Sequence, residues 1–177
     1  MKDRVQSLLE ADHQSLNSLL IEIDADINNP DISRIFAQVD RFWARLAVHI
    51  RAEHLQLFAV LDKVPARLFS SRNGLPTADE AQELMARLRA DHDFFMKELA
   101  LVIKALRGVV GEEAARREAV VNVSERLRII RQRLDRHNQI EEEEVYRWPS
   151  LLLEETALSE LIDGLRHELR NLPPRLD

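Results

Sequence analysis

Two short stretches of the sequence place a histidine four residues before a glutamate. They are His49 with Glu53 in "HIRAEHLQLF" and His137 with Glu141 in "HNQIEEEEVY". On an α-helix, residues four apart lie on the same face about one turn apart, so each pair would present an imidazole and a carboxylate to one place. These groups are ligands for first-row metal ions, although a run of glutamates alone is more often a solvated helix face.

Each pair follows a lone histidine that lies about one helix earlier in the chain. His13 in "ADHQSL" and His92 in "ADHDFF" have similar surroundings, so the chain contains the same pattern twice. Four of its six histidines fall in this repeat, which a solvated face does not explain. The repeat predicts one site with six ligands: His13, His49, Glu53, His92, His137 and Glu141.

The two histidine–glutamate pairs continue apolar stripes. Leu46 and Leu57 flank the first pair at helical spacing, and Leu134 and Val145 flank the second. Burying several ionisable groups is strongly unfavourable unless a cation neutralises and binds them. Four imidazoles and two carboxylates are too many ligands for one tetrahedral zinc ion. They suit two first-row metals bridged by the carboxylates, with iron favoured over manganese. Without metal, we expect the mutual repulsion of the carboxylates to make at least one of them take up a proton.

The elements that must position these residues are helices, because apolar residues recur at helical spacing and no segment alternates as a strand does. The expected helices span residues 2–27, 32–62, 77–107, 113–147 and 156–171. Long helices with short connections predict an all-α fold, an up-down-up-down four-helix bundle with an additional C-terminal helix. The four histidines then lie in one layer, roughly 15–20 Å from one end at 1.5 Å rise per residue.

The last two helices raise separate questions. The fourth helix is about eight to ten residues too long for the third, so residues 112–120 should project as a helix unless the helix starts near Val121–Ser124. We expect the bundle to occupy residues 1–148. Residues 149–177 would carry a helix whose apolar stripe packs on the bundle or forms the contact of a homodimer.

Composition limits the classes of function. The net charge is −6 and the isoelectric point is near 5.6, with no basic face in the sequence, so we expect no nucleic-acid partner. The chain has no cysteine, which excludes disulfides, iron–sulfur clusters and thiol catalysis. No apolar run has the length of a membrane span, and the N-terminus lacks the apolar stretch of a signal peptide. We therefore expect a cytoplasmic protein with no membrane partner.

The order H…HxxxE…H…HxxxE resembles the hemerythrin-like family, the His-His-Glu cation-binding bundles, over about residues 1–148. The resemblance implies that the four histidines are terminal ligands of two non-haem iron ions. Glu53 and Glu141 would bridge these ions, with an oxo or hydroxo bridge, and manganese or zinc is the alternative metal. Oxygen carriers have a further histidine where this chain has Met96. The chain therefore looks more like the four-histidine, two-glutamate branch, which includes proteins linked to repair of damaged iron centres.

The resemblance implies a di-iron protein that handles oxygen, nitric oxide or peroxide in sensing, stress response or iron-centre repair. Whether it turns over nitric oxide or peroxide as an enzyme stays open. The alternative is a structural or partner-binding bundle with a degenerate or zinc-filled site. A ferritin-like site is disfavoured because Glu10 and His13 form one ExxH motif, but Arg89 stands where a second glutamate is needed.

The other residues near the motif have plainer expected roles. His54 should lie at the surface or behind a ligand, His167 should face solvent, and Glu142 could contact a ligand from outside. Asn17 and Met96 could line a pocket for a small ligand. Core packing is expected for the following aromatic residues: Trp43, Phe58, Phe95, Tyr146 and Trp148.

Overall fold

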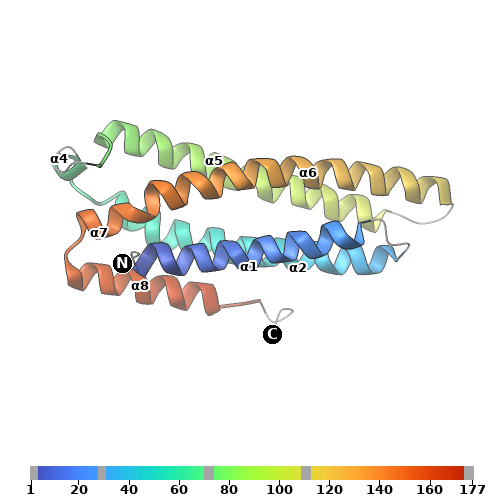
Figure 1. Cartoon of the computed structure of the whole chain (residues 1–177), viewed down its shortest axis with the longest axis horizontal. Helices are drawn as coiled ribbons and strands as arrows, with labels where there is room; N and C mark the ends of the chain where they lie inside the picture. The colour runs from blue at the N-terminus through green and yellow to red at the C-terminus, as the bar shows by residue number, and fades with distance from the viewer. Residues whose placement is uncertain (1–3, 28–30, 70–73, 109–112, 174–177) are drawn as a thin grey trace.

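The computed structural model describes residues 4–27, 31–69, 74–108 and 113–173, and every regular element in these ranges is helical (Figure 1). The long helices are α1 (Arg4–Asp26), α2 (Ile32–Ala52), α5 (Ala78–Arg107), α6 (Glu113–Glu143) and α8 (Glu155–Arg170). The short elements are the π-helical η1 (Glu53–Phe58), α3 (Ala59–Leu61), α4 (Ala66–Phe69), the 3₁₀-helical η2 (Val145–Arg147) and α7 (Trp148–Leu152). The predicted all-α class is confirmed.

The four longest helices form an antiparallel bundle, in which α1 and α2 lie beside each other below α5 and α6 in the view of Figure 1. The closest packing joins α5 to α6, α1 to α2 and α2 to α5, whereas α1 and α6 pack less closely. Side chains fix the predicted helix starts. Asp31 accepts hydrogen bonds from the backbone N–H groups of Ser33 and Arg34, and Thr77 forms a capping box with Glu80.

The apolar core is divided into two clusters along the bundle. The cluster towards α7 and α8 includes Val5, Leu57, Met85, Trp148 and Leu165. The cluster towards the opposite end includes Leu20, Phe42, Leu99, Ile130 and Leu134. Along each of the four bundle helices, the change from one cluster to the other falls at the predicted ligand residues. The polar layer therefore lies within the core, with apolar packing on both sides.

Two of the predicted helices are irregular, and each irregularity lies at or shortly after a predicted ligand. The helix expected over residues 32–62 changes from α to π geometry at Glu53. The helix expected over residues 113–147 ends at Glu143 and is followed by the 3₁₀ turn η2. Its predicted end was wrong by four residues because Glu144 leaves helical geometry, with φ −120° and ψ −75°. Single π-helical turns within helices are rare and often occur at functional sites.

The helix α6 begins at Glu113, as the projecting alternative predicted. From Arg117 onward, its first buried side chain is Val123. Ala119 and Asn122 line a hollow with Gly108 just after the end of α5, so the turns before Ala119 extend past α5 (Figure 1). None of the helices described is both long and apolar enough to cross a bilayer.

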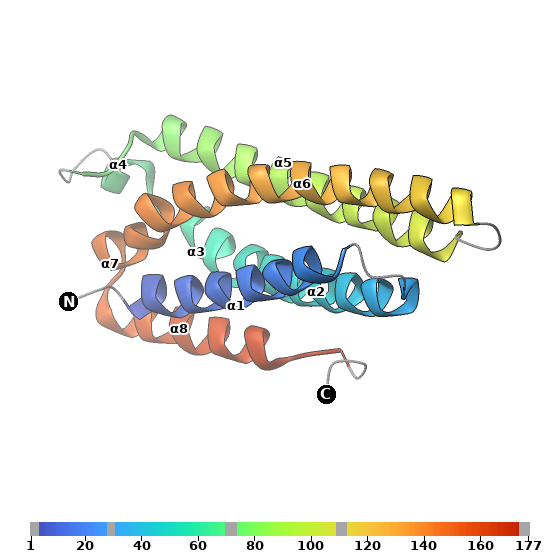
Figure 2. The same cartoon turned by 45° about the vertical axis from the view of Figure 1, so that its right-hand side comes forward.

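The C-terminal helix folds back on its own bundle, where α8 packs against α2, η1 and α1 (Figure 2). This is one of the two arrangements expected from its apolar stripe. Arg51 holds its end by donating to the Glu168 carboxylate at 2.8 Å and to the Asn171 carbonyl at 2.8 Å. Gly164 lies so close to Gln56 of η1 that a Cβ atom there would collide with this glutamine side chain.

The packing of α8 predicts a large loss of stability for Leu165→Ala. Leu165 is fully buried in the first core cluster, so the substitution should lower the free energy of unfolding by about 2–5 kcal/mol through lost burial and an unfilled cavity. Leu55→Ala is the matched control, because Leu55 is 56% exposed and should change stability by at most about 0.5 kcal/mol. Urea unfolding of the metal-free protein measures both. Equal effects would contradict the packing of α8 described here.

Candidate metal centre

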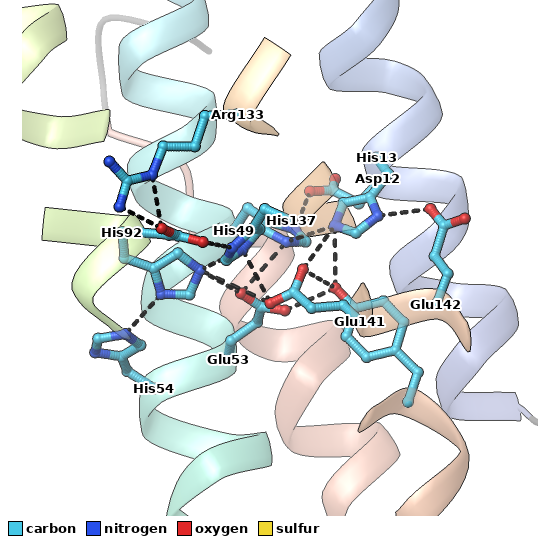
Figure 3. Close-up of polar contacts among 12 residues, drawn as sticks. Asp12, His13, His49, Glu53, His54, His92, Arg133, His137, Glu141 and Glu142 are labelled. Carbon is cyan, nitrogen blue, oxygen red and sulfur yellow. Dashed lines mark hydrogen bonds and ion pairs between the residues drawn. The ribbon is translucent and has the colours of Figure 1, made fainter. Parts of the chain in front are cut away.

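The structure brings all six predicted site residues together in the middle of the bundle (Figure 3). His13 comes from α1, His49 from α2, Glu53 from the first turn of η1, and His92 from α5. The last helix of the bundle, α6, contributes His137 and Glu141. All six are buried, and both glutamates are fully inaccessible to solvent.

The histidines form two pairs. In the first half-site, Nε2 of His13 lies 3.1 Å from Nε2 of His49. In the second half-site, Nε2 of His92 lies 2.9 Å from Nε2 of His137. Each pair joins both glutamates in a group whose candidate ligand atoms lie within 4.8 Å of one another. The site therefore consists of two neighbouring positions that share two carboxylates.

Each carboxylate spans the two half-sites. Glu53 Oε2 lies 3.5 Å from His49 Nε2 and 3.2 Å from His92 Nε2. Glu141 places Oε2 3.4 Å from His13 Nε2 and Oε1 3.1 Å from His137 Nε2. Glu141 therefore offers one oxygen to each half-site, whereas Glu53 faces both half-sites with the same oxygen.

Two buried carboxylate oxygens without a hydrogen bond indicate that the site fits a pair of metal ions. Glu53 Oε2 and Glu141 Oε1 are buried and have no hydrogen-bond partner among the described residues. A buried polar atom without a partner costs about 1–3 kcal/mol, and more when it is charged. The Nε2 atoms of the four histidines face these oxygens across the same small space (Figure 3). A cation in each half-site would satisfy the oxygens and nitrogens together.

The charges of the site are distributed differently from the sequence-based expectation. Burial alone would raise the pKa of Glu53, but His49 and His92 outweigh burial and hold it well below its usual range. The pKa of Glu141 is lowered too, because its neighbouring histidines outweigh both burial and the repulsion of Glu53. The expected protonated carboxylate is therefore wrong, since that expectation counted the repulsion between the glutamates and not the four imidazoles.

The imidazoles hold the protons instead. Burial by itself would lower the pKa of His137. The carboxylates of Glu141, Asp91 and Glu53 have the larger, opposite effect, and the pKa is raised from 6.5 to about 9. The pKa of His49 is raised well above its usual value by Glu53 and Asp12 against the effect of burial. In the metal-free site, His49 and His137 are consequently imidazolium groups beside ionised carboxylates.

Two aspartate–arginine pairs hold the outer nitrogens of one histidine in each half-site. His49 Nδ1 lies 2.9 Å from Asp12 Oδ2, and Asp12 Oδ1 accepts from Arg45 at 2.7 Å. A carboxylate on the far nitrogen fixes the ring orientation of a ligand histidine and makes it more basic.

The same arrangement occurs in the second half-site. His137 Nδ1 lies 3.3 Å from Asp91 Oδ2, and Asp91 Oδ1 accepts from Arg133 at 2.6 Å. The sequence-based prediction did not include the two aspartate–arginine pairs, Asp12 with Arg45 and Asp91 with Arg133. The signal was present, because an aspartate precedes the lone histidine in both halves of the repeat and an arginine stands four residues before each HxxxE motif.

The other two outer contacts differ between the half-sites. His13 Nδ1 lies 2.8 Å from Glu142 Oε1, whereas His92 Nδ1 lies 2.8 Å from His54 Nε2. Glu142 directly follows Glu141 and His54 directly follows Glu53, so the two residues occupy matching positions in the repeat. The contacts of Glu142 and His54 with ligands from outside are as expected. The first half-site is supported by a carboxylate and the second by an imidazole.

Tyr146 lies at the centre of the site, which the expectation of simple core packing did not include. Its hydroxyl group donates to Glu53 Oε1 at 2.7 Å and also lies 3.1 Å from Glu141 Oε2 and 3.0 Å from His13 Nε2. Burial, together with the charges of Glu141 and Glu53, raises the pKa of Tyr146 well above its usual value, so the phenol keeps its proton. A continuous helix would direct Tyr146 elsewhere, and the break at Glu144 turns it inward. Pro149 was the available signal for that break.

The remaining expectations concern residues near the site. His167 is exposed, as expected. Glu10 accepts from Gln6 and Arg89 pairs with Asp62, so neither joins the site and no ferritin-like ExxH pair forms in the described structure. Met96 packs with the second core cluster, whereas Asn17 lines a cleft beside His13.

Comparison with known families agrees with this geometry. The hemerythrin HHE cation binding domain matches residues 4–149, which include all four bundle helices and all six clustered residues and leave α8 outside. No curated protein and no solved structure matches the chain. The match covers well over half of the chain, and the chain belongs to the hemerythrin HHE cation-binding family.

Proposed function

We propose that the protein is a non-haem di-iron protein of the cytoplasm that binds oxygen, nitric oxide or peroxide in sensing, stress response or iron-centre repair. The observation that carries the proposal is the pair of half-sites with two shared carboxylates, each of which has one buried oxygen without a hydrogen-bond partner in the described structure. His13 and His49 would hold one ion, and His92 and His137 the other. Glu53 and Glu141 would bind both.

The donor set supports iron. Imidazole and carboxylate ligands suit iron and manganese, and zinc can occupy similar donors. When bound, a pair of iron ions would supply a redox centre for a diatomic molecule or for peroxide. Met96 stands where oxygen carriers have a further histidine, which favours the four-histidine, two-glutamate branch and its stress-related roles over reversible oxygen transport.

The surrounding residues suit chemistry on a small molecule. Tyr146 presents a protonated hydroxyl group beside both shared carboxylates, so it can donate a hydrogen bond or a proton at the centre of the site. The apolar clusters on both sides limit access of water to this layer. The aspartate–arginine pairs keep the imidazole rings oriented.

The first prediction concerns metal content. We expect about two iron ions per chain after anaerobic loading and desalting, measured by elemental analysis. Removing a ligand from either half-site should lower occupancy sharply, so His49→Ala and His137→Ala test both positions. His167→Ala is the control, because His167 is exposed on α8 and should leave the metal content unchanged. Full occupancy in both ligand variants would overturn the ligand assignment. Zinc bound in preference to iron would favour the alternative of a structural or partner-binding bundle.

Competition between metal and protons gives a second prediction. The pKa of His137 in the metal-free protein is about 9, above its usual 6.5, so this imidazole carries a proton at pH 7. Metal binds neutral imidazole, so loading must expel that proton. We expect the apparent affinity to rise as the pH is raised from 7 to about 9, because His137 loses its proton over this range. Chelator competition with Co²⁺ measures it, and an affinity that does not change between pH 7 and 9 would contradict the protonation described here.

A third prediction concerns the aspartates behind the ligands. Asp12→Asn and Asp91→Asn should each weaken the binding of one of the two ions by roughly 10–100-fold, because the histidine in that half-site loses its orienting carboxylate. The binding curve should become biphasic, which a general loss of stability would not produce. Asp93→Asn, at an exposed position of α5, is the control. Binding that weakens equally for both ions in each variant would argue against separate half-sites.

A further inference from the structure

A cleft between α1 and α6 is lined in part by His13, one of the clustered residues of the first half-site. It has a volume of about 250 Å³. Exposed polar side chains form its walls, among them Gln14 and Asn17 of α1 and Asp135 and Gln139 of α6. The cleft lies where the bundle is packed least closely, between α1 and α6.

Glu142 stands between the cleft and the site. Its carboxylate lies 2.8 Å from His13 Nδ1, and its side chain is still 35% exposed (Figure 3). On the far side of the ring, His13 Nε2 lies 3.4 Å from Glu141 Oε2. One imidazole therefore separates a carboxylate in contact with solvent from a shared carboxylate that has an unpaired oxygen.

The acidic side chains of the cleft outnumber its basic groups. Asp135, Glu142 and Glu143 line it, Glu142 pairs with His13, and no lysine or arginine is among the described residues that line it. A neighbouring hollow shares Glu142 and Glu143 and adds Glu10 and Glu144, with Arg147 as its basic residue. Clefts lined by one sign of charge concentrate counter-ions and speed their arrival. This side of the protein thus attracts cations towards His13.

A second hollow, beside His137, has a mostly basic lining. A groove between α5 and α6 reaches His137, and it is lined by Arg87, Arg133 and Arg136 together with Asp91 and Asp135. Asp91 is already paired with Arg133. The remaining lining charges are two arginines against one aspartate, which disfavours a divalent cation.

We propose that the cleft between α1 and α6 is the route by which divalent metal ions reach the buried ligands. Glu142 is the carboxylate that receives the ion at the first half-site. The proposal rests on the proposed metal-binding function and adds to it the direction of loading. It concerns the rate of loading, whereas the ligand assignment concerns the amount bound at equilibrium.

The absence of cysteine makes a direct test available, because one introduced cysteine can be modified at one place only. Gln14→Cys places a maleimide-linked bulky group in the α1–α6 cleft, and Gln132→Cys places the same group in the α5–α6 groove. Both positions are exposed glutamines on long helices, so the two variants are matched. The probe is Co²⁺, whose binding is followed by visible absorption after rapid mixing with metal-free protein.

We expect modified Gln14→Cys to load Co²⁺ at least tenfold more slowly and to reach the same final amount as the unmodified variant. Modified Gln132→Cys should load at the unmodified rate. Equal slowing by both groups, or slowing by the group at Gln132 alone, would overturn the route. Unmodified protein that holds no Co²⁺ at equilibrium would show that the proposed metal binding itself is wrong, and the route would then be rejected with it.

Charge supplies a second measurement. Glu143→Gln removes one negative charge from the cleft without changing a ligand, so loading should slow about threefold at low salt and little at about 1 M salt, where surface charges are screened. Glu160→Gln on an exposed position of α8 is the matched control and should leave the rate unchanged. The same slowing by both variants, or slowing that does not depend on salt, would show that the acidic lining does not guide the ion.

Discussion

Burial of two carboxylates and four imidazoles in one layer of the core is the constraint on which this structure depends. The layer divides the apolar core into two clusters, and each long helix of the bundle must pass from one cluster to the other through a polar position. Such a layer is tolerable only if every group in it finds a partner. The imidazole–carboxylate contacts provide most of the partners, and Glu53 Oε2 and Glu141 Oε1 are the buried carboxylate oxygens that face imidazoles without a hydrogen bond. Metal binding and folding are therefore linked through the same residues.

The duplicated sequence motif explains the near-symmetry of the layer. Each half of the chain supplies an aspartate and a histidine from one helix, and an arginine, a histidine and a glutamate from the next. The backbone departs from α-helical geometry near both glutamates, in a π-helical segment that begins at Glu53 and in a 3₁₀ turn that begins four residues after Glu141. These departures let residues close behind the glutamates turn towards the site, among them His54 and Tyr146. The irregular backbone is thus part of how the site is built.

The sequence was informative where a regular helix is a good approximation. Helical spacing and the repeat predicted the bundle and the six clustered residues, because residues four apart share a face. Tyr146 and the π-helical segment could not be predicted this way, since both depend on local backbone changes that tertiary packing selects. The aspartate–arginine pairs were within reach of the repeat, but the contact joins different helices and becomes evident only in three dimensions. The protonation of the site also required all the distances at once, because four imidazoles compete with two carboxylates.

The two half-sites differ at the residue that follows each shared glutamate in the chain. His13 is backed by Glu142 and borders an acidic cleft, whereas His92 is backed by His54 and packs against the Phe58 ring at 6.0 Å between centroids. A carboxylate behind an imidazole strengthens it as a ligand, whereas a second imidazole in the same place adds no negative charge. One replacement in the repeat, glutamate in one copy and histidine in the other, therefore gives the two positions different outer partners. The duplication provides two equal sets of ligands, and these outer residues make the two positions chemically distinct.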